Sequence, residues 1–212
     1  MDLVERLQKV PTATVSDALD RLGLQGVMDG ISPLTEGTTL CGPALTVKED
    51  VGELGTYTLD EFRIGEVINV AKRNDVIGFD AGGRRVSTWG SLATRAAIAK
   101  GVGGVVADGA VRDIEEIRKL RFPVFARHVA PRSGKTRIKV SSINDVIQCG
   151  GIKLAPGDII VGDETGLVVV PRNKATEVLK TATELVEAEK RFEKLVEQGR
   201  TFGDAARELL HM

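Results

Sequence analysis

Hydrophobic residues recur along the chain at two spacings, one typical of helices and one of strands. Near the N-terminus, apolar residues three or four positions apart predict one face of a helix: Val15, Ala18, Leu19 and Leu22. We expect Thr14 to cap this helix and Gly23 to end it, because a hydroxyl accepts from the first free N–H groups and glycine adopts the left-handed conformation.

Between residues 40 and 127, predicted strands alternate with predicted helices. The strands are expected at 40–47, 76–80, 103–108 and 122–127, and the helices at 64–71, 91–100 and 113–120. Gly42-Pro43 interrupts the first strand and marks an edge or a bend. This alternation is typical of an α/β fold, and a doubly wound parallel sheet is one arrangement that fits it.

In the last third of the chain, the predicted secondary structure changes twice. From Ser133 to Pro171 the pattern indicates strands separated by turns, at 155–158 and 163–166. After Pro171 one long, charged helix is expected to reach residue 198 and to end at Gly199. Its apolar face must pack on the domain or on a neighbouring subunit, and consists of Val178, Leu185, Leu195 and Val196.

Composition narrows the class of protein. The chain has 212 residues, 42% hydrophobic, which is enough for one sizeable core. A net charge of -1 gives no field that would recruit nucleic acid or an anionic membrane. The N-terminus is too polar for a signal peptide, and no apolar run is long enough to cross a bilayer. We therefore expect a cytoplasmic protein whose two cysteines, Cys41 and Cys149, are free and buried.

The candidate functional residues lie at the ends of two predicted elements, one helix and one strand. Gly90-Ser91-Leu92-Ala93 opens the helix at 91–100, and the free N–H groups of a helix start bind carboxylates. Arg112-Asp113 follows a predicted buried strand. Arginine offers a planar fork for an anion, and aspartate is a ligand for a hard cation. Although an aspartate at a helix start beside a surface arginine is also common in structural roles, the combination suits an enzyme that holds a 2-oxo acid against a divalent cation.

One other motif gives weaker evidence of a functional site. Ser133-Gly134-Lys135-Thr136 has the ending of a phosphate-binding loop. The full pattern requires glycine where this chain has Val129, and the surrounding sequence is rich in strands. It is not a nucleotide site.

The chain resembles a known family over most of its length. The matching segments are Thr12 to Leu19, Cys41 to Val47, Trp89 to Asp113, Ala155 to Asp158, Gly162-Asp163 and Gly166 to Pro171. Together they resemble the RraA-like family of class II aldolases, which cleave 4-hydroxy-4-methyl-2-oxoglutarate and 4-carboxy-4-hydroxy-2-oxoadipate. The same family includes non-aldolase regulators of ribonuclease E.

The resemblance implies a fold and an assembly. The family fold is a layered α/β/β swivelling domain, here spanning residues 1–212 with a long C-terminal helix at 173–198. It implies a homo-trimer or hexamer, with that helix used in oligomer contacts. The doubly wound α/β sheet is the fallback.

The resemblance also implies a site. The substrate-binding residues fall on Gly90, Ser91, Leu92, Ala93 and Arg112, the metal ligand on Asp113, and the catalytic pair on Arg112 and Asp113. Ser91 is a departure, because the aldolases usually carry an acidic residue there and serine brings no charge. The regulators typically lack the aspartate after the arginine, whereas Asp113 is present.

The implied activity is that of a lyase dependent on Mg²⁺ or Mn²⁺. It would cleave a 4-hydroxy-2-oxo acid to pyruvate and decarboxylate oxaloacetate. Two alternatives stay open: a non-catalytic binding protein of the ribonuclease E inhibitor branch, and a lyase for a different, sugar-derived hydroxy-oxo acid.

Overall fold

A central sheet organises the structure, a computed structural model that describes the backbone of residues 2–210 and the side chains of residues 2–207. The main strand order is β1-β6-β5-β3-β2-β10-β11, with β4 paired to β5 and β7 paired to β2. The strands are β1 (Ser32–Pro33), β2 (Leu40–Val51), β3 (Val76–Asp80), β4 (Ser87–Trp89), β5 (Gly104–Val111), β6 (Val124–Val129), β7 (Ile138–Ile143), β10 (Ile159–Asp163) and β11 (Gly166–Val170). Strands β2, β3, β5 and β6 are parallel neighbours, and their central residues are fully buried.

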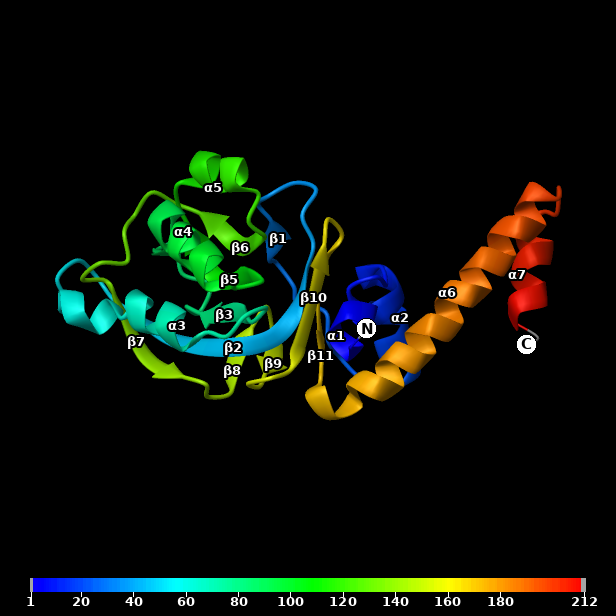
Figure 1. Cartoon of the computed structure of the whole chain (residues 1–212), viewed down its shortest axis with the longest axis horizontal. Helices are drawn as coiled ribbons and strands as arrows, with labels where there is room; N and C mark the ends of the chain where they lie inside the picture. The colour runs from blue at the N-terminus through cyan, green and yellow to red at the C-terminus, as the bar shows by residue number, and fades with distance from the viewer. Residues whose placement is uncertain (1, 211–212) are drawn as a thin grey trace.

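One face of the sheet is covered by helices and the other by a hairpin (Figure 1). The helical face carries η1 (Leu59–Phe62), α3 (Ile64–Val70), α4 (Ser91–Lys100) and α5 (Ile114–Leu120). Val67, Ala97 and Ile117 of these helices pack on the sheet. The opposite face is covered by β8 (Ile147–Cys149) and β9 (Ile152–Leu154). The layers are therefore α/β/β, as expected, and not the two helical faces of a doubly wound sheet.

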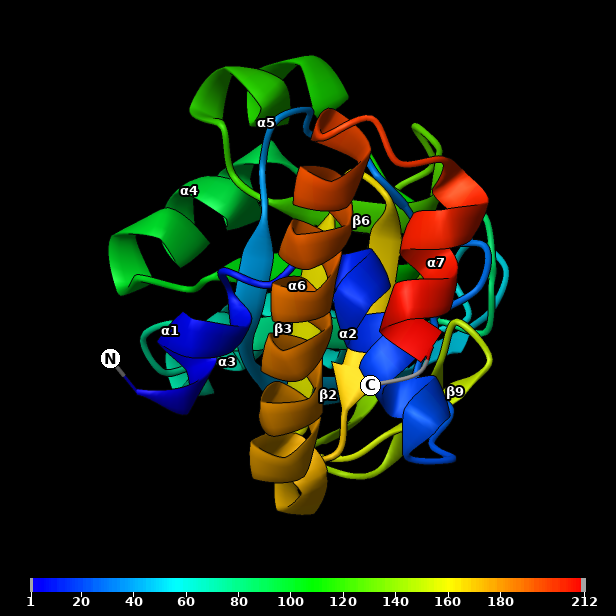
Figure 2. The same cartoon turned by 90° about the vertical axis from the view of Figure 1, so that its right-hand side faces the viewer.

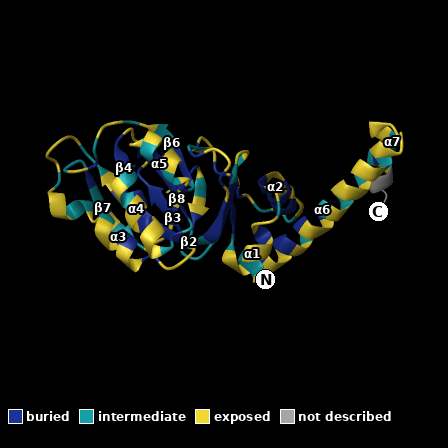
Figure 3. Cartoon of the chain, turned by 45° about the horizontal axis from the view of Figure 1, so that its top comes forward, coloured by how far each residue is buried: buried dark blue, intermediate teal, exposed yellow. Residues whose placement is uncertain are grey.

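A second helical group lies against β10 and β11. It consists of α1 (Leu3–Leu7), α2 (Thr12–Arg21), η2 (Arg172–Lys174) and α6 (Ala175–Glu197), and α7 (Phe202–Leu210) packs on α6. In Figure 2, α6 crosses the front of the molecule beside α2 and α7. Of its predicted apolar face, Val178 and Leu185 are buried on the domain, whereas Val196 lies farther out and is exposed. Figures 1 and 3 show this outer part of α6 projecting from the layers as an arm with α7 folded back along it, mostly exposed.

Several boundaries differ from the sequence prediction. The helix predicted around Val15 begins at Thr12 after Pro11, so Thr14 is a buried helical residue and not its cap. Strand β2 continues through Gly42-Pro43 to Val51, and it changes partner from β10 to β7 on one side after Pro43. Gly42 is needed there because a side chain would collide with the backbone carbonyl of Asn74.

Across residues 2–210, the structure contains no helix with the length and apolar character needed to span a bilayer. Cys41 and Cys149 are both free and buried, as expected.

Candidate active site

The predicted site residues meet at a cavity of about 150 Å³ between the start of α4 and the end of β5. Gly90, Leu92, Ala93, Arg112 and Asp113 all line it. Ser91 contacts Asp113 instead: its Oγ donates to the Asp113 carboxylate oxygen Oδ2 over 3.1 Å. The sequence prediction thus names residues that share one place in the fold.

Strand β4 brings these two segments together. Trp89, its last residue, lies opposite Val111 of β5, and the Arg112 backbone N–H donates to the Trp89 carbonyl over 3.0 Å. The Trp89 indole N–H donates to the Thr94 hydroxyl over 2.8 Å, and that hydroxyl donates to the Gly90 carbonyl over 3.1 Å. The beginning of α4 is therefore fixed against the end of β5.

Asp113 holds an uncommon backbone conformation. With φ 59° and ψ 37° it is left-handed, and its side chain does not cap the helix α5 that follows. Instead Oδ2 accepts from the Ser91 N–H and hydroxyl, both at 3.1 Å, and lies 3.8 Å from the Arg112 Nε. Within the described residues Oδ1 accepts no hydrogen bond, and the side chain is 38% exposed. One carboxylate oxygen is therefore free to bind a ligand.

The start of α4 provides donors for an anion. The first bond within the helix runs from the Thr94 N–H to the Gly90 carbonyl over 3.0 Å, so three N–H groups precede it. The Ser91 N–H is used by Asp113, which leaves those of Leu92 and Ala93. Leu92, Ala93 and Arg112 line the same cavity. The arrangement suits a carboxylate with an adjacent oxo group.

A divalent cation would have few protein ligands here. No group of three or more His, Cys, Asp or Glu side chains with metal-site geometry occurs in the part of the chain that the structure describes. Mg²⁺ is commonly held by one or two carboxylates and completes its shell with water and substrate oxygens. Asp113, with the Ser91 hydroxyl beside it, fits a cation bound in that way.

Other residues at the cavity were not predicted as site residues. Phe62 and Ile64 line it from the helical face, and Thr88 lines it from β4. Ser133 and Lys135 also line it. They belong to the Ser-Gly-Lys-Thr motif that the sequence excludes as a nucleotide site. For Ser133 and Lys135, this motif was the feature of the sequence that could have indicated a place in the site.

Glu49 is a buried carboxyl beside this cavity. It lies on β2, is 3% exposed, and its Oε1 is hydrogen-bonded to the hydroxyl of Thr88. Burial raises the pKa of Glu49 to about 8, although the hydrogen bond from Thr88 acts in the opposite direction. The folded chain therefore keeps a proton that the unfolded chain releases in the window from about pH 4.5 to about pH 8.

This difference predicts a pH-dependent stability. The free energy of unfolding should fall as the pH rises through that window, by on the order of a few kcal/mol, because the folded state binds more protons than the unfolded state. Glu49→Gln should remove this decline. Urea denaturation of both chains at several pH values measures it, and equal slopes for the two chains would show that Glu49 is ionised when folded.

Gly90 allows Asp113 and Arg112 to approach α4. A Cβ at this position would lie 2.7 Å from Asp113 Oδ2 and 3.2 Å from Arg112 Cγ. The backbone of Gly90 is extended (φ -160°), so alanine is not strained by its conformation.

Gly90→Ala is therefore expected to displace the Arg-Asp pair while the fold is retained. A displacement of site groups by a fraction of an ångström lowers kcat/KM, and we expect roughly a tenfold loss of the activity that this pair supports. Gly65→Ala on α3, where a Cβ meets nothing, is the matched control. Equal activity of the two variants would contradict a close-packed pair.

Comparison with known proteins relates the chain to one family. The profile of the RraA-like family, described as Aldolase/RraA, matches residues 12–169. A protein of Halalkalibacterium halodurans named putative 4-hydroxy-4-methyl-2-oxoglutarate aldolase is 35% identical over 185 residues, which cover 86% of this chain and 82% of that protein.

Solved structures agree with the fold. A protein of Pseudomonas syringae pv. tomato superposes with a TM-score of 0.86 at 30% identity, covering 96% of both chains. Streptomyces coelicolor RraAS2, described as an unusual member of the RNase ES inhibitor RraA family, superposes with a TM-score of 0.78 at 27% identity, covering 89% of this chain and 93% of that one.

Proposed function

The chain belongs to the RraA-like family of aldolases and their relatives, and from that premise we propose that it is a divalent-metal-dependent lyase which cleaves a 4-hydroxy-2-oxo acid to pyruvate. The observation that carries the proposal is the meeting of Arg112, Asp113 and the first turn of α4 at one cavity. The aldolase name of the Halalkalibacterium relative supports the reaction class.

Each protein group has a distinct part in this proposal. The Leu92 and Ala93 N–H groups bind the substrate carboxylate at the positive end of α4. Arg112 donates to the keto oxygen, where negative charge develops as pyruvate enolate forms. Asp113, oriented by Ser91, holds the cation. A bound Mg²⁺ or Mn²⁺ supplies Lewis-acid polarisation of that keto group.

The same groups support a second reaction. Decarboxylation of oxaloacetate also produces pyruvate enolate, and it requires no proton acceptor for a C4 hydroxyl. We therefore propose oxaloacetate decarboxylase activity at the same site.

A test begins with pyruvate release measured by coupling to lactate dehydrogenase. Oxaloacetate, 4-hydroxy-4-methyl-2-oxoglutarate and sugar-derived 4-hydroxy-2-oxo acids are each supplied with Mg²⁺, with EDTA, and with Mg²⁺ restored. The expected result is turnover that EDTA abolishes and Mg²⁺ restores. Absence of turnover for every acid would favour a binding protein of the regulator kind, to which the Streptomyces structure is assigned.

A substitution of Ser91 is expected to affect the two reactions differently. Ser91→Asp places a second carboxylate beside Asp113, which strengthens cation binding and adds a proton acceptor near the substrate. Aldol cleavage requires that acceptor and decarboxylation does not, so cleavage should rise more. Both rates are measured at saturating Mg²⁺, and an equal change in the two would contradict this role.

We also propose a homo-trimer or hexamer in which the C-terminal helix predicted at 173–198 contacts a neighbouring subunit. The exposed outer part of α6 and its partner α7 support this assignment, since Val196 and Phe202 are 43% and 74% exposed. Sedimentation equilibrium of the full chain measures the assembly.

A further inference from the structure

Glu49 lies on the helix-covered face of the sheet, where charge is unfavourable. It alternates along β2 with the buried Val47 and pairs with Val140 of β7, and both valines belong to the core under the helices. Its Oε1 contacts the Thr88 hydroxyl, whereas Oε2 is buried and has no hydrogen-bond partner among the described residues. An ionised carboxylate with an unpaired oxygen would be costly there, so the carboxyl group carries its proton.

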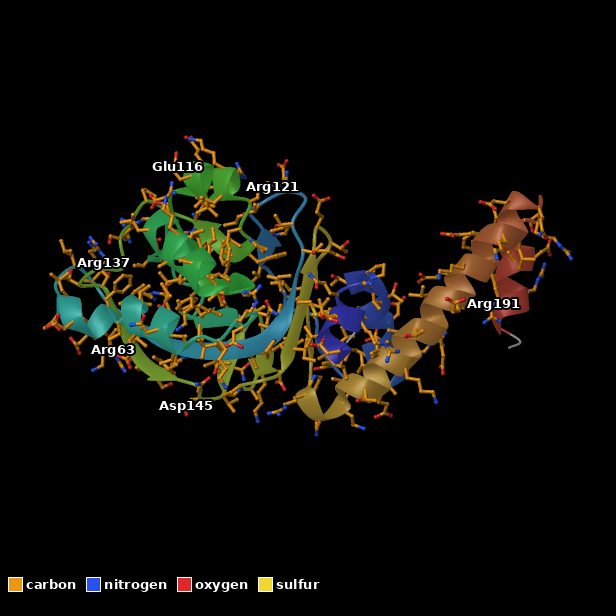
Figure 4. All side chains as sticks on the ribbon, viewed as in Figure 1. Arg63, Glu116, Arg121, Arg137, Asp145 and Arg191 are labelled. Carbon is orange, nitrogen blue, oxygen red and sulfur yellow. The ribbon has the colours of Figure 1, made fainter. Side chains whose placement is uncertain are left out.

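Among residues 2–207, no ion pair to the Glu49 carboxyl group is found; Arg112 and Lys135 line the cavity that Thr88 also lines. Charged groups on β2, β3, β7 and the start of α3 are paired with one another: Lys48 with Asp80 at 2.7 Å, Lys139 with Glu61 at 3.0 Å, and Arg63 with Glu66 at 2.6 Å. Arg63, at the end of the molecule opposite the α6–α7 arm (Figure 4), also donates to the Val140 carbonyl over 3.2 Å. Asp80 is itself an anion and further disfavours charge on Glu49.

The protonated carboxyl group determines what Thr88 can do. A carboxylic acid has one O–H donor, and the Thr88 hydroxyl, the partner of Glu49 among the described residues, can accept from it as well as donate to it. When Glu49 donates, the hydrogen of the Thr88 hydroxyl is free for another acceptor. When Glu49 is ionised, the hydroxyl must donate to the carboxylate instead. Thr88 is among the residues that line the cavity of the proposed active site, which places this hydroxyl next to a bound ligand.

We propose that Glu49 and Thr88 form a proton-controlled donor at the cavity: while Glu49 keeps its proton, the Thr88 hydroxyl donates to an oxygen of the bound 2-oxo acid. Loss of the Glu49 proton to solvent turns the hydroxyl toward Glu49 and removes the donor from the ligand. The identity of the ligand rests on the proposed function, whereas the pairing of Glu49 with Thr88 does not. Glu49 is a positioning residue, because it acts through Thr88.

The test is the affinity for oxalate, an analogue of pyruvate enolate, measured by calorimetry with Mg²⁺ from about pH 6 to about pH 10. The affinity of the wild-type chain should fall about fivefold as Glu49 ionises, which corresponds to one hydrogen bond of about 1 kcal/mol. Glu49→Gln should bind with the low-pH affinity throughout, because its amide N–H always donates to Thr88. Thr88→Val should bind about fivefold more weakly at low pH and show no step.

Two further measurements separate the outcomes. Thr88→Ser keeps the hydroxyl and should keep the step, which distinguishes donation from packing. The infrared carbonyl band of a protonated carboxyl group, present in the wild-type chain and absent in Glu49→Gln, reports the proton without any ligand. A step that persists in Glu49→Gln would overturn the proposal, as would a missing band. In a further outcome, the wild-type chain shows the band but binds no oxalate and releases no pyruvate. In that case the proposed function is wrong, and so is the ligand assigned to Thr88.

Discussion

Asp113→Asn is expected to abolish metal-dependent pyruvate release. The amide keeps the size of the side chain and can still accept from the Ser91 N–H, but it removes the negative charge that holds a hard cation. The left-handed backbone is retained, because asparagine tolerates this conformation as well as aspartate. Turnover of oxaloacetate is measured as a function of Mg²⁺ concentration, and the loss should persist at saturating Mg²⁺.

The control for this variant is Glu115→Gln, which removes a carboxylate from the first turn of the same helix α5 without touching the cavity. Its activity should match that of the wild-type chain. Thermal unfolding of both variants should remain close to that of the wild type, since exposed substitutions change stability by about 0.5 kcal/mol or less. Unchanged turnover and unchanged Mg²⁺ response in Asp113→Asn would exclude Asp113 as the ligand.

Arg112→Lys is expected to lower kcat/KM by roughly 30- to 1,000-fold, or about 2–4 kcal/mol of transition-state stabilisation. Lysine keeps the charge but replaces the planar fork by a single ammonium, so it cannot hold the keto oxygen with the same geometry. The loss should appear in kcat as well as in KM, because the charge on that oxygen is largest in the transition state.

Arg95→Lys is the matched control, because Arg95 is exposed on α4 and lies 3.9 Å from Glu116, away from the cavity. It should leave both kinetic constants unchanged. A decrease of less than about tenfold in Arg112→Lys would mean that Arg112 does not stabilise the enolate.

Periodicity predicted the long helices closely, whereas strand β2 extends four residues past its expected end. The helix α4 has the predicted bounds, 91–100, and Gly101 adopts the left-handed conformation at its end. Strand β4 was missed, because three residues are too few to show an alternation. That strand joins α4 to β5. The proximity of Ser91 and Asp113 was therefore accessible from the family resemblance and not from local pattern.

Two features of the site could not be predicted from the sequence, and each has a physical reason. The left-handed backbone of Asp113 depends on tertiary contacts with α4, whereas local preference places aspartate at a helix start as a cap. Glu49 stands between Lys48 and Asp50 in a charged segment that is typical of solvent. Its inward position follows only from continuing the alternation of Leu45 and Val47 past the residue at which strand β2 was expected to end.

The pairing of β2 has a consequence for the order in which the protein forms. Leu40 lies opposite Gly162, and Val51 lies opposite Ile138, so one strand closes contacts with distant parts of the chain. Such long loops make folding slow, since their closure entropy is lost before the contacts are gained. During synthesis, β2 and β3 emerge long before β10, and the edge of β2 that β10 later covers stays open to other chains. Aggregation of nascent or truncated chains is therefore expected to begin at Leu40–Pro43.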